Sequence, residues 1–216
     1  MEDEMNALQK NETWIIVEKP NDQKIGMCKW VLRVKRDSLS KCIRYNARLV
    51  AQGFSQVPRI DFKDTFSPTL KIMSFCMLVG LVASLNLELH HLDVQTTFLH
   101  GELDEEVYIQ PPYFESAQFP NHVCRLRKSI YGFHQSPLVW YNCLHSFLLS
   151  YGYVRLRNKP YIYIYIQMNA SNFILIGVFV DDLPLKSNSL SYITICKQEL
   201  KVSFHQSRSH VLFSSN

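Results

Sequence analysis

The sequence lacks the cysteine spacing that zinc sites and redox motifs require. Its six cysteines are scattered, and even the nearest pair, Cys28 and Cys42, is too widely separated for a C-x-x-C motif. We therefore expect reduced thiols in an intracellular protein, in the cytoplasm or the nucleus.

Long hydrophobic runs are also missing. The longest apolar stretch, Phe75 to Leu87, contains Ser84 and Asn86 and falls short of the roughly 20 residues that span a bilayer. The sequence opens with Met-Glu-Asp-Glu, whereas a secretion signal opens with basic residues. We expect no membrane partner and no secretion.

Charged residues are few and unevenly placed. They make up 19% of the 216 residues against 47% hydrophobic residues, which is typical of a folded chain with one sizeable domain or two small lobes around a cleft. From Lys24 to Arg59 there are nine Lys or Arg residues and one acid, Asp37, so the rest of the chain is net acidic. A basic lobe next to a lobe that carries carboxylates suits a polynucleotide-processing protein. The basic lobe would bind phosphates, and the carboxylates would bind the metal ions that act on those phosphates. A merely soluble basic face remains the other interpretation.

Three aspartates stand at the ends of apolar segments. Asp181 and Asp182 follow the β-branched run from Ile174 to Val180, and Asp93 follows a second apolar stretch. Aspartate is a poor strand former, so its place beside a strand predicts a hairpin turn or a hard-metal site. If the two strands are neighbours in one sheet, the carboxylates could hold the two Mg²⁺ or Mn²⁺ ions of a phosphoryl-transfer site.

The sequence resembles the reverse transcriptase of copia-type LTR retrotransposons. F-V-D-D at Phe179–Asp182 is similar to the family's Y-V-D-D box, and D-V-Q-T-T-F-L-H-G at Asp93–Gly101 is similar to D-V-K-T-A-F-L-N-G. Further boxes follow in family order at Met5–Trp14, Lys29–Lys35, Arg44–Phe54, Asp64–Thr69, Glu105–Pro112 and Lys128–Pro137.

The resemblance implies an α+β right-hand polymerase fold, with fingers at about 14–60, a palm at about 61–190 and no thumb. It also implies RNA-directed DNA polymerase activity, with Asp93, Asp181 and Asp182 as catalytic residues and ligands of Mg²⁺ or Mn²⁺. The implied partners are an RNA/DNA template-primer, dNTPs, and the protease, integrase and RNase H segments of an intact Pol polyprotein. Residues 191–216 match no family box and are interpreted as a degenerate tail.

The resemblance further assigns five nucleotide-binding residues. Alternation predicts strands at 29–35 and 44–50, and their pairing as a hairpin would gather cations on one face. In the family this region grips the triphosphate, which implicates Lys35, Arg44 and Arg48. Phe98 would reject a ribose 2′-hydroxyl, although a core phenylalanine is the alternative. Gln135 would touch the nucleotide or the template.

Several positions depart from the family pattern. Cations that the family carries are replaced at Asn46, Cys76, His134 and Leu138. Pro184 follows the metal box, although proline fits only an edge strand or a bulge. Two other functions therefore stay open, namely a non-catalytic relic with weak nucleic-acid binding and a metal-dependent phosphohydrolase.

The remaining local predictions concern helices and loops. Ser67-Pro68 predicts the start of a helix that runs towards Leu87. Pro137 and Gly152 bracket a second helix, residues 191–203 form a third, and residues 111–120 and 168–172 form a loop and a turn. His90 and His91 lie on opposite faces of one strand and are interpreted as structural. Five apolar residues of the first helix are assigned to the core: Met73, Met77, Val79, Leu81 and Leu85.

Overall fold

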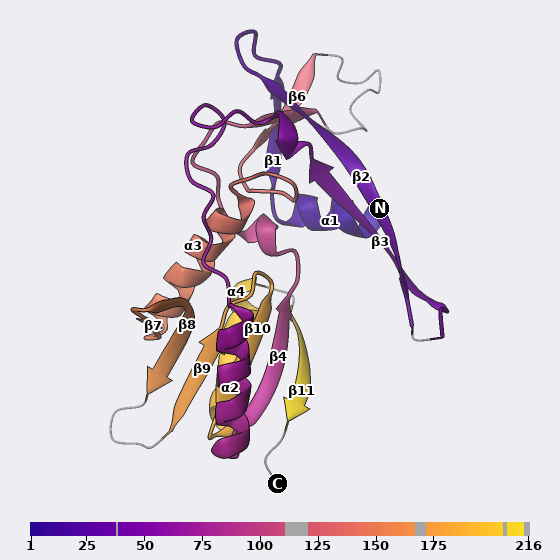
Figure 1. Ribbon diagram of the computed structural model, residues 1–216. Coiled ribbons are helices and arrows are strands. Elements are labelled where there is room, and N and C mark those ends of the chain that lie inside the picture. Colours follow the sequence, from indigo (N-terminus) through magenta and orange to yellow (C-terminus); the bar gives the residue numbers. More distant parts are fainter. Residues whose placement is uncertain (38, 111–120, 167–171, 205–206, 214–216) are drawn as a thin grey trace. The chain divides into compact units, whose positions relative to one another are not determined.

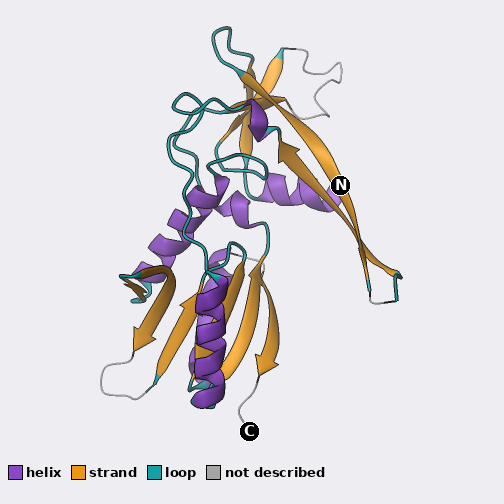
Figure 2. Ribbon diagram, in the orientation of Figure 1, coloured by secondary structure: helices purple, strands orange, loops and turns teal. Residues whose placement is uncertain are grey.

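The computed structural model describes residues 1–37, 39–110, 121–166 and 172–204 and the backbone of 207–213. Two compact units, each built from two chain segments, make up the protein: unit 1 is Met1–Phe66 with Phe98–Trp140, and unit 2 is Ser67–Thr97 with Tyr141–Asn216. Both contain helices and strands, which confirms the α+β class (Figures 1 and 2). The predicted loop at 111–120 and most of the predicted turn at 168–172 lie outside the described residues.

Unit 1 is organised around a five-stranded sheet with the order β1-β6-β5-β2-β3. All neighbours pair antiparallel except β2 and β5, which run parallel. A core of buried residues that includes Leu8, Leu49, Ile109 and Ile130 supports the sheet. Its elements are α1 (Glu2–Lys10), β1 (Trp14–Glu18), β2 (Ile25–Arg36), β3 (Cys42–Ala51), the 3₁₀ helix η1 (Gly53–Ser55), β5 (Tyr108–Gln110) and β6 (His122–Leu126).

Unit 2 contains a six-stranded antiparallel sheet with the order β11-β4-β10-β9-β8-β7. Its elements are α2 (Ile72–Ser84), β4 (Glu88–Val94), β7 (Val154–Leu156), β8 (Lys159–Ile166), β9 (Phe173–Gly177), β10 (Asp182–Ser187), α4 (Leu190–Phe204) and β11 (Ser207–Phe213). Two elements cross the boundary between the units: the 3₁₀ helix η2 (Thr97–His100) and α3 (Ser136–Ser150).

Opposite faces of the unit 2 sheet are covered by α2 and α4. On one face, Leu78 of α2 packs with Ile162 of β8 and Leu175 of β9. On the other face, Lys197 of α4 contacts His90 of β4. Because side chains alternate along a strand, the register sends Asp93, His91, Asp182 and Lys186 to the α2 side.

Helix α2 differs from its prediction in both start and phase. It begins at Ile72 rather than at Ser67-Pro68, because the Leu70 N–H donates to the carbonyl of Val178 and Lys71 stays extended. The five residues assigned to the core are exposed, at 77% for Met73, 52% for Met77, 57% for Leu85 and 37% each for Val79 and Leu81. Ser74, Leu78 and Val82 are buried instead. A segment that is apolar on every side gives no contrast from which its buried face can be read.

The other helix predictions are confirmed. Helix α3 begins at Ser136, and Gly152 follows its end with a φ of 82°, a backbone conformation that favours glycine. The helix predicted at 191–203 is α4. Residues 207–213 form β11, whose backbone pairs with β4.

The structure also describes the surroundings of the cysteines and the length of the apolar helices. Among the described residues the six cysteines form no disulfide with one another, and burial raises the pKa of the Cys28 and Cys124 thiols to about 12. Among the described residues, no helix is both long and apolar enough to cross a bilayer.

Candidate active site

The three aspartates lie at one end of the unit 2 sheet. Strands β4 and β10 pair antiparallel, and Asp182 stands directly opposite Asp93. The Val94 N–H donates to the Asp181 carbonyl at 2.9 Å, so Asp181 adjoins the same end of β4. The two segments are therefore neighbouring strands, which is the condition under which the sequence suggested a shared metal site.

A two-residue turn, Val180 and Asp181, leads into Asp182, the first residue of β10. The Phe179 N–H donates to the Asp182 carbonyl at 2.9 Å, and the Asp182 N–H donates to the Phe179 carbonyl at 3.0 Å. Val180, between them, has a φ of 57°, which a β-branched residue adopts only under strain. Two reciprocal hydrogen bonds thus close the turn, and the bond from the Val94 N–H to the Asp181 carbonyl joins it to β4.

Pro184 lies within a central strand, so the expectation that it fits only an edge or a bulge is wrong. It pairs with His91 of β4, whereas the pairing of β10 with β9 begins one residue later, at Leu185 and Ile176. Proline has no backbone N–H, and at Pro184 this donor is missing at a position where β10 is not yet paired with β9. Gly177 makes room for the ring, because a Cβ there would lie 3.0 Å from Pro184 Cγ. Both Phe179–Asp182 hydrogen bonds form next to Pro184, so the proline leaves this hairpin closed.

Neighbouring side chains hold two of the three carboxylates. His91 Nε2 lies 2.9 Å from Asp182 Oδ1, and the Asp182 side chain is 42% exposed. Gln95 Nε2 donates to Asp93 Oδ1 at 3.2 Å. The alternation of β4 places His91 two residues from Asp93 on the same face, and that spacing could have predicted the contact with Asp182.

The carboxylate oxygens are the donors that a hard cation such as Mg²⁺ prefers. Within the described ranges, however, no group of three His, Cys, Asp or Glu side chains is gathered closely enough to hold a metal ion. The chain therefore offers the facing pair Asp93 and Asp182, with Asp181 in the adjoining turn, rather than a closed cage. Such an open arrangement suits Mg²⁺, which usually takes one or two protein carboxylates and completes its shell with water and phosphate oxygens.

His90, on the opposite face of β4, is part of the packed interior. Its Nδ1 lies 2.5 Å from Lys197 Nζ, and its Nε2 lies 3.6 Å from Glu88 Oε2. Burial, and then the nearby Lys197 ammonium, lower the pKa of His90. This setting agrees with the structural interpretation of His90.

The predicted cationic surface is present in unit 1. The β2–β3 hairpin pairs Lys35 with Arg44 and Val31 with Arg48, so these three cations share one face of the hairpin. Arg48 is exposed, and its guanidinium carbon lies 4.6 Å from the centre of the Tyr131 ring.

Gln135 is buried and held by protein groups. Its Oε1 accepts from Gln56 Nε2 at 2.9 Å, and its Nε2 donates to the Asp61 carbonyl at 3.4 Å. Gln56 Oε1 in turn accepts from the His134 N–H at 2.9 Å. Contact between Gln135 and a nucleotide stays a prediction. Gln56, which the sequence did not single out, fastens the segment that carries Gln135.

The predicted sugar-selecting residue, Phe98, is half-buried in unit 1. Its ring meets that of Tyr131 edge to face, with 4.9 Å between centroids. Ser129 Oγ donates to the Phe98 carbonyl at 2.6 Å. Phe98 thus packs against other residues of unit 1 but stays partly exposed to solvent.

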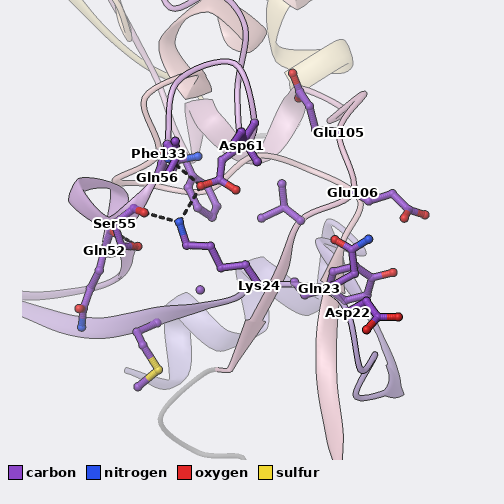
Figure 3. Close-up of a pocket in the computed structure, with 16 residues that line it drawn as sticks. Asp22, Gln23, Lys24, Gln52, Ser55, Gln56, Asp61, Glu105, Glu106 and Phe133 are labelled. Carbon is purple, nitrogen blue, oxygen red and sulfur yellow. Dashed lines mark hydrogen bonds and ion pairs between the residues drawn. The ribbon is translucent and has the colours of Figure 1, made fainter.

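Unit 1 also contains an open cavity of about 560 Å³, beside Gln56 and Phe133 (Figure 3). Lys24 Nζ lies 2.7 Å from Asp61 Oδ2 inside it and also contacts the Ser55 carbonyl. Burial raises the pKa of Asp61, but hydrogen bonds from Lys24 and from the Val57 N–H outweigh burial and lower that pKa overall. Glu105 and Glu106 complete an acidic wall, which is unfavourable for a bare phosphate.

Comparison with known proteins places this sequence in a family. The family model described as reverse transcriptase (RNA-dependent DNA polymerase) matches residues 11–212, including residues that the motif boxes had not reached. The chain is 42% identical over 94% of its length to the retrovirus-related Pol polyprotein from transposon TNT 1-94 of Nicotiana tabacum. It is 37% and 36% identical over 87% of its length to those from transposons RE2 and RE1 of Arabidopsis thaliana. It spans only 15%, 13% and 13% of these three relatives. The chain belongs to the reverse transcriptase family of copia-type retrotransposon Pol polyproteins.

Proposed function

We propose that this chain carries out RNA-directed DNA polymerisation, by transfer of a nucleotide from a dNTP to the 3′-hydroxyl of a primer. The observation that carries the proposal is the pairing of Asp93 with Asp182 beside the turn that holds Asp181. In the proposed reaction the primer 3′-hydroxyl loses its proton to solvent as its oxygen bonds to the α-phosphorus. The bond from the α-phosphorus to the oxygen that bridges to the β-phosphate breaks, and pyrophosphate leaves.

Asp93, Asp181 and Asp182 are the residues that would hold Mg²⁺ or Mn²⁺. When bound, such ions lower the pKa of the attacking hydroxyl and neutralise the charge that develops on the phosphates. The chain's own contribution is positional. The hydrogen-bonded turn and the β4–β10 register fix where the carboxylates stand, and a displacement of about 1 Å can cost on the order of 10²-fold in rate.

The cations of unit 1 would bind the substrate's phosphates. Arg44 and Arg48 can each direct several N–H donors at phosphate oxygens, and Lys35 adds a point charge. We assign the β2–β3 hairpin to the fingers and the β4–β10 pair to the palm. The proposed partners are an RNA/DNA template-primer, dNTPs and, in an intact element, the protease, integrase and RNase H segments of Pol.

Primer extension on an RNA template tests this proposal. The purified chain is supplied with Mg²⁺ or Mn²⁺ and dNTPs, beside a double variant, Asp181→Asn with Asp182→Asn, that keeps the side-chain size. We expect short products rather than processive synthesis, because four cations of the family pattern are replaced by Asn46, Cys76, His134 and Leu138. We also expect the double variant to form no product.

The two arms separate the candidate functions. Extension that the double variant abolishes supports the polymerase. Absence of extension from a folded wild-type chain favours the non-catalytic relic. Release of inorganic phosphate from dNTPs without primer extension favours the phosphohydrolase.

A further inference from the structure

Three side chains of unit 1, Arg48, Tyr131 and Phe98, contact one another in a row. The Arg48 guanidinium lies over one face of Tyr131, 4.6 Å from the ring centre. The Tyr131 ring meets Phe98 at an interplanar angle of 75°. Arg48 and Phe98 are the proposed triphosphate and sugar contacts, whereas Tyr131, which touches both, has no assigned role.

The backbone of Tyr131 is fastened to β3. Its carbonyl accepts from the Ala51 N–H at 2.7 Å, and it forms a parallel bridge with Val50. The next residue, Gly132, has a φ of 97°, and a Cβ there would come within 2.2 Å of the Ala51 carbonyl oxygen. The chain can approach β3 this closely only with glycine at that position. The Tyr131 ring is therefore held at a fixed place relative to the strand that carries Arg48.

We propose that Tyr131 is a positioning residue that aligns Arg48 and Phe98 with each other, so that one ring sets both the grip on the triphosphate and the rejection of the ribose 2′-hydroxyl. This inference rests on the proposed polymerase function. An exposed arginine samples many rotamers, and a ring against one face of the guanidinium restricts that sampling. The stacked guanidinium keeps its N–H groups pointing outward in the plane, where phosphate oxygens can accept from them.

The edge contact has a matching effect on Phe98. A half-buried phenylalanine that excludes a hydroxyl must stay in one rotamer, because a rotated ring would leave space for the extra oxygen. Tyr131 supplies the packing that holds this rotamer from one side. Loss of the Tyr131 ring should consequently weaken nucleotide binding and relax sugar selection together.

The inference is tested by measuring nucleotide binding on a primer that cannot be extended, so that no polymerisation occurs. The full chain is mixed with an RNA template and a DNA primer that ends in a 3′-deoxynucleotide, and the affinities for dATP and ATP opposite a template U are measured by calorimetry. Three variants are compared with the wild type. Tyr131→Leu removes the ring, Tyr131→Phe keeps it, and Tyr45→Leu removes a 78%-exposed ring from the opposite face of the same strand.

We expect Tyr131→Leu to bind dATP roughly fivefold more weakly, the factor that corresponds to one cation–π contact of ordinary strength. The preference for dATP over ATP should fall in the same variant. Tyr131→Phe and Tyr45→Leu should both stay within about twofold of the wild type in affinity and preference, since neither removes the stacked ring. A merely structural role for Tyr131 would lower the melting temperature but leave the preference for dATP over ATP unchanged.

The outcomes separate this inference from the function on which it rests. If the wild type binds dATP and Tyr131→Leu matches it in affinity and preference, the positioning role is refuted while the polymerase stands. A loss in Tyr131→Leu that Tyr131→Phe shares also refutes it, because the hydroxyl rather than the ring would then matter. If the folded wild type binds no nucleotide on the template-primer, the proposed function fails and the inference fails with it.

Discussion

Lys186 is a buried charge whose removal should stabilise the protein. Its side chain is wholly buried in β10, with Nζ 5.7 Å from the centre of the Phe75 ring, and within the described part of the chain Nζ has no hydrogen-bond partner. Burial lowers the pKa of Lys186 from 10.5 to about 8. Since one pKa unit corresponds to about 1.4 kcal/mol, keeping this ammonium charged inside the fold costs about 3 kcal/mol.

The pH dependence of this cost has a definite sign. Below pH 8 the lysine is charged in both the folded and the unfolded protein, so the full cost applies. Between pH 8 and 10.5 the folded protein releases the proton while the unfolded chain still holds it, and the cost disappears as the pH rises. Lys186→Met, which keeps the length and apolar stem of the side chain, should therefore raise the free energy of unfolding by about 3 kcal/mol at pH 7. The gain should shrink towards zero at pH 10.5.

Urea unfolding followed by circular dichroism measures this difference, with hydrogen exchange of the β10 amides to locate it in unit 2. Tryptophan fluorescence serves as an internal control, because all three tryptophans, Trp14, Trp30 and Trp140, belong to unit 1. Lys201→Met, at an exposed lysine of α4, is the matched variant and should change stability by less than about 0.5 kcal/mol. A gain for Lys186→Met that is equally large at pH 7 and pH 10.5 would refute the electrostatic argument, and a loss at pH 7 would show that the ammonium contributes to the fold.

Three further predictions follow from the sites described above. Phe98→Ala should raise the incorporation of rNTPs relative to dNTPs in primer extension, and unchanged discrimination would return Phe98 to a packing role. Gly177→Ala should destabilise unit 2 by about 1–3 kcal/mol, because the new methyl group would meet Leu70 and Pro184 at 3.0 Å; Gly80→Ala, where a Cβ meets no atom within 4 Å, is the control. Mn²⁺ should raise the melting temperature of the wild type but not that of Asp93→Asn with Asp182→Asn, and an equal rise in both proteins would place the ion elsewhere.

The sequence was sufficient to predict features that depend on alternation and on strand ends. The cationic hairpin follows from the period of two along 29–35 and 44–50. The aspartates beside two mostly apolar segments indicated a shared site only if those strands were neighbours, and the β4–β10 pairing meets that condition. These are local patterns with a single structural solution once the strands pair.

Features that depend on a partner could not be predicted in this way. Whether Pro184 disrupts a strand depends on which neighbour its missing N–H faces, and only the β9–β10 register shows that the ladder is open there. The buried face of α2 has no signal in a helix that is apolar on nearly every side. Gln56 holds its segment through Gln135 and His134, which are distant in the sequence. In each case the deciding information lies in a tertiary contact.

The position of β4 between β10 and β11 has a consequence for the order of folding during translation. Strand β4 ends at Val94, whereas both strands that flank it come from residues 182–213. At a synthesis rate of about 5–20 residues per second, the strand that carries Asp93 waits on the order of 5–20 s before its first neighbour leaves the ribosome. Throughout that interval an unpaired strand with two open edges is exposed to other nascent chains. Slower translation downstream of β4 would lengthen the exposure and lower the yield of soluble protein, whereas unit 1 could begin its β2–β3 hairpin as soon as residue 51 has emerged.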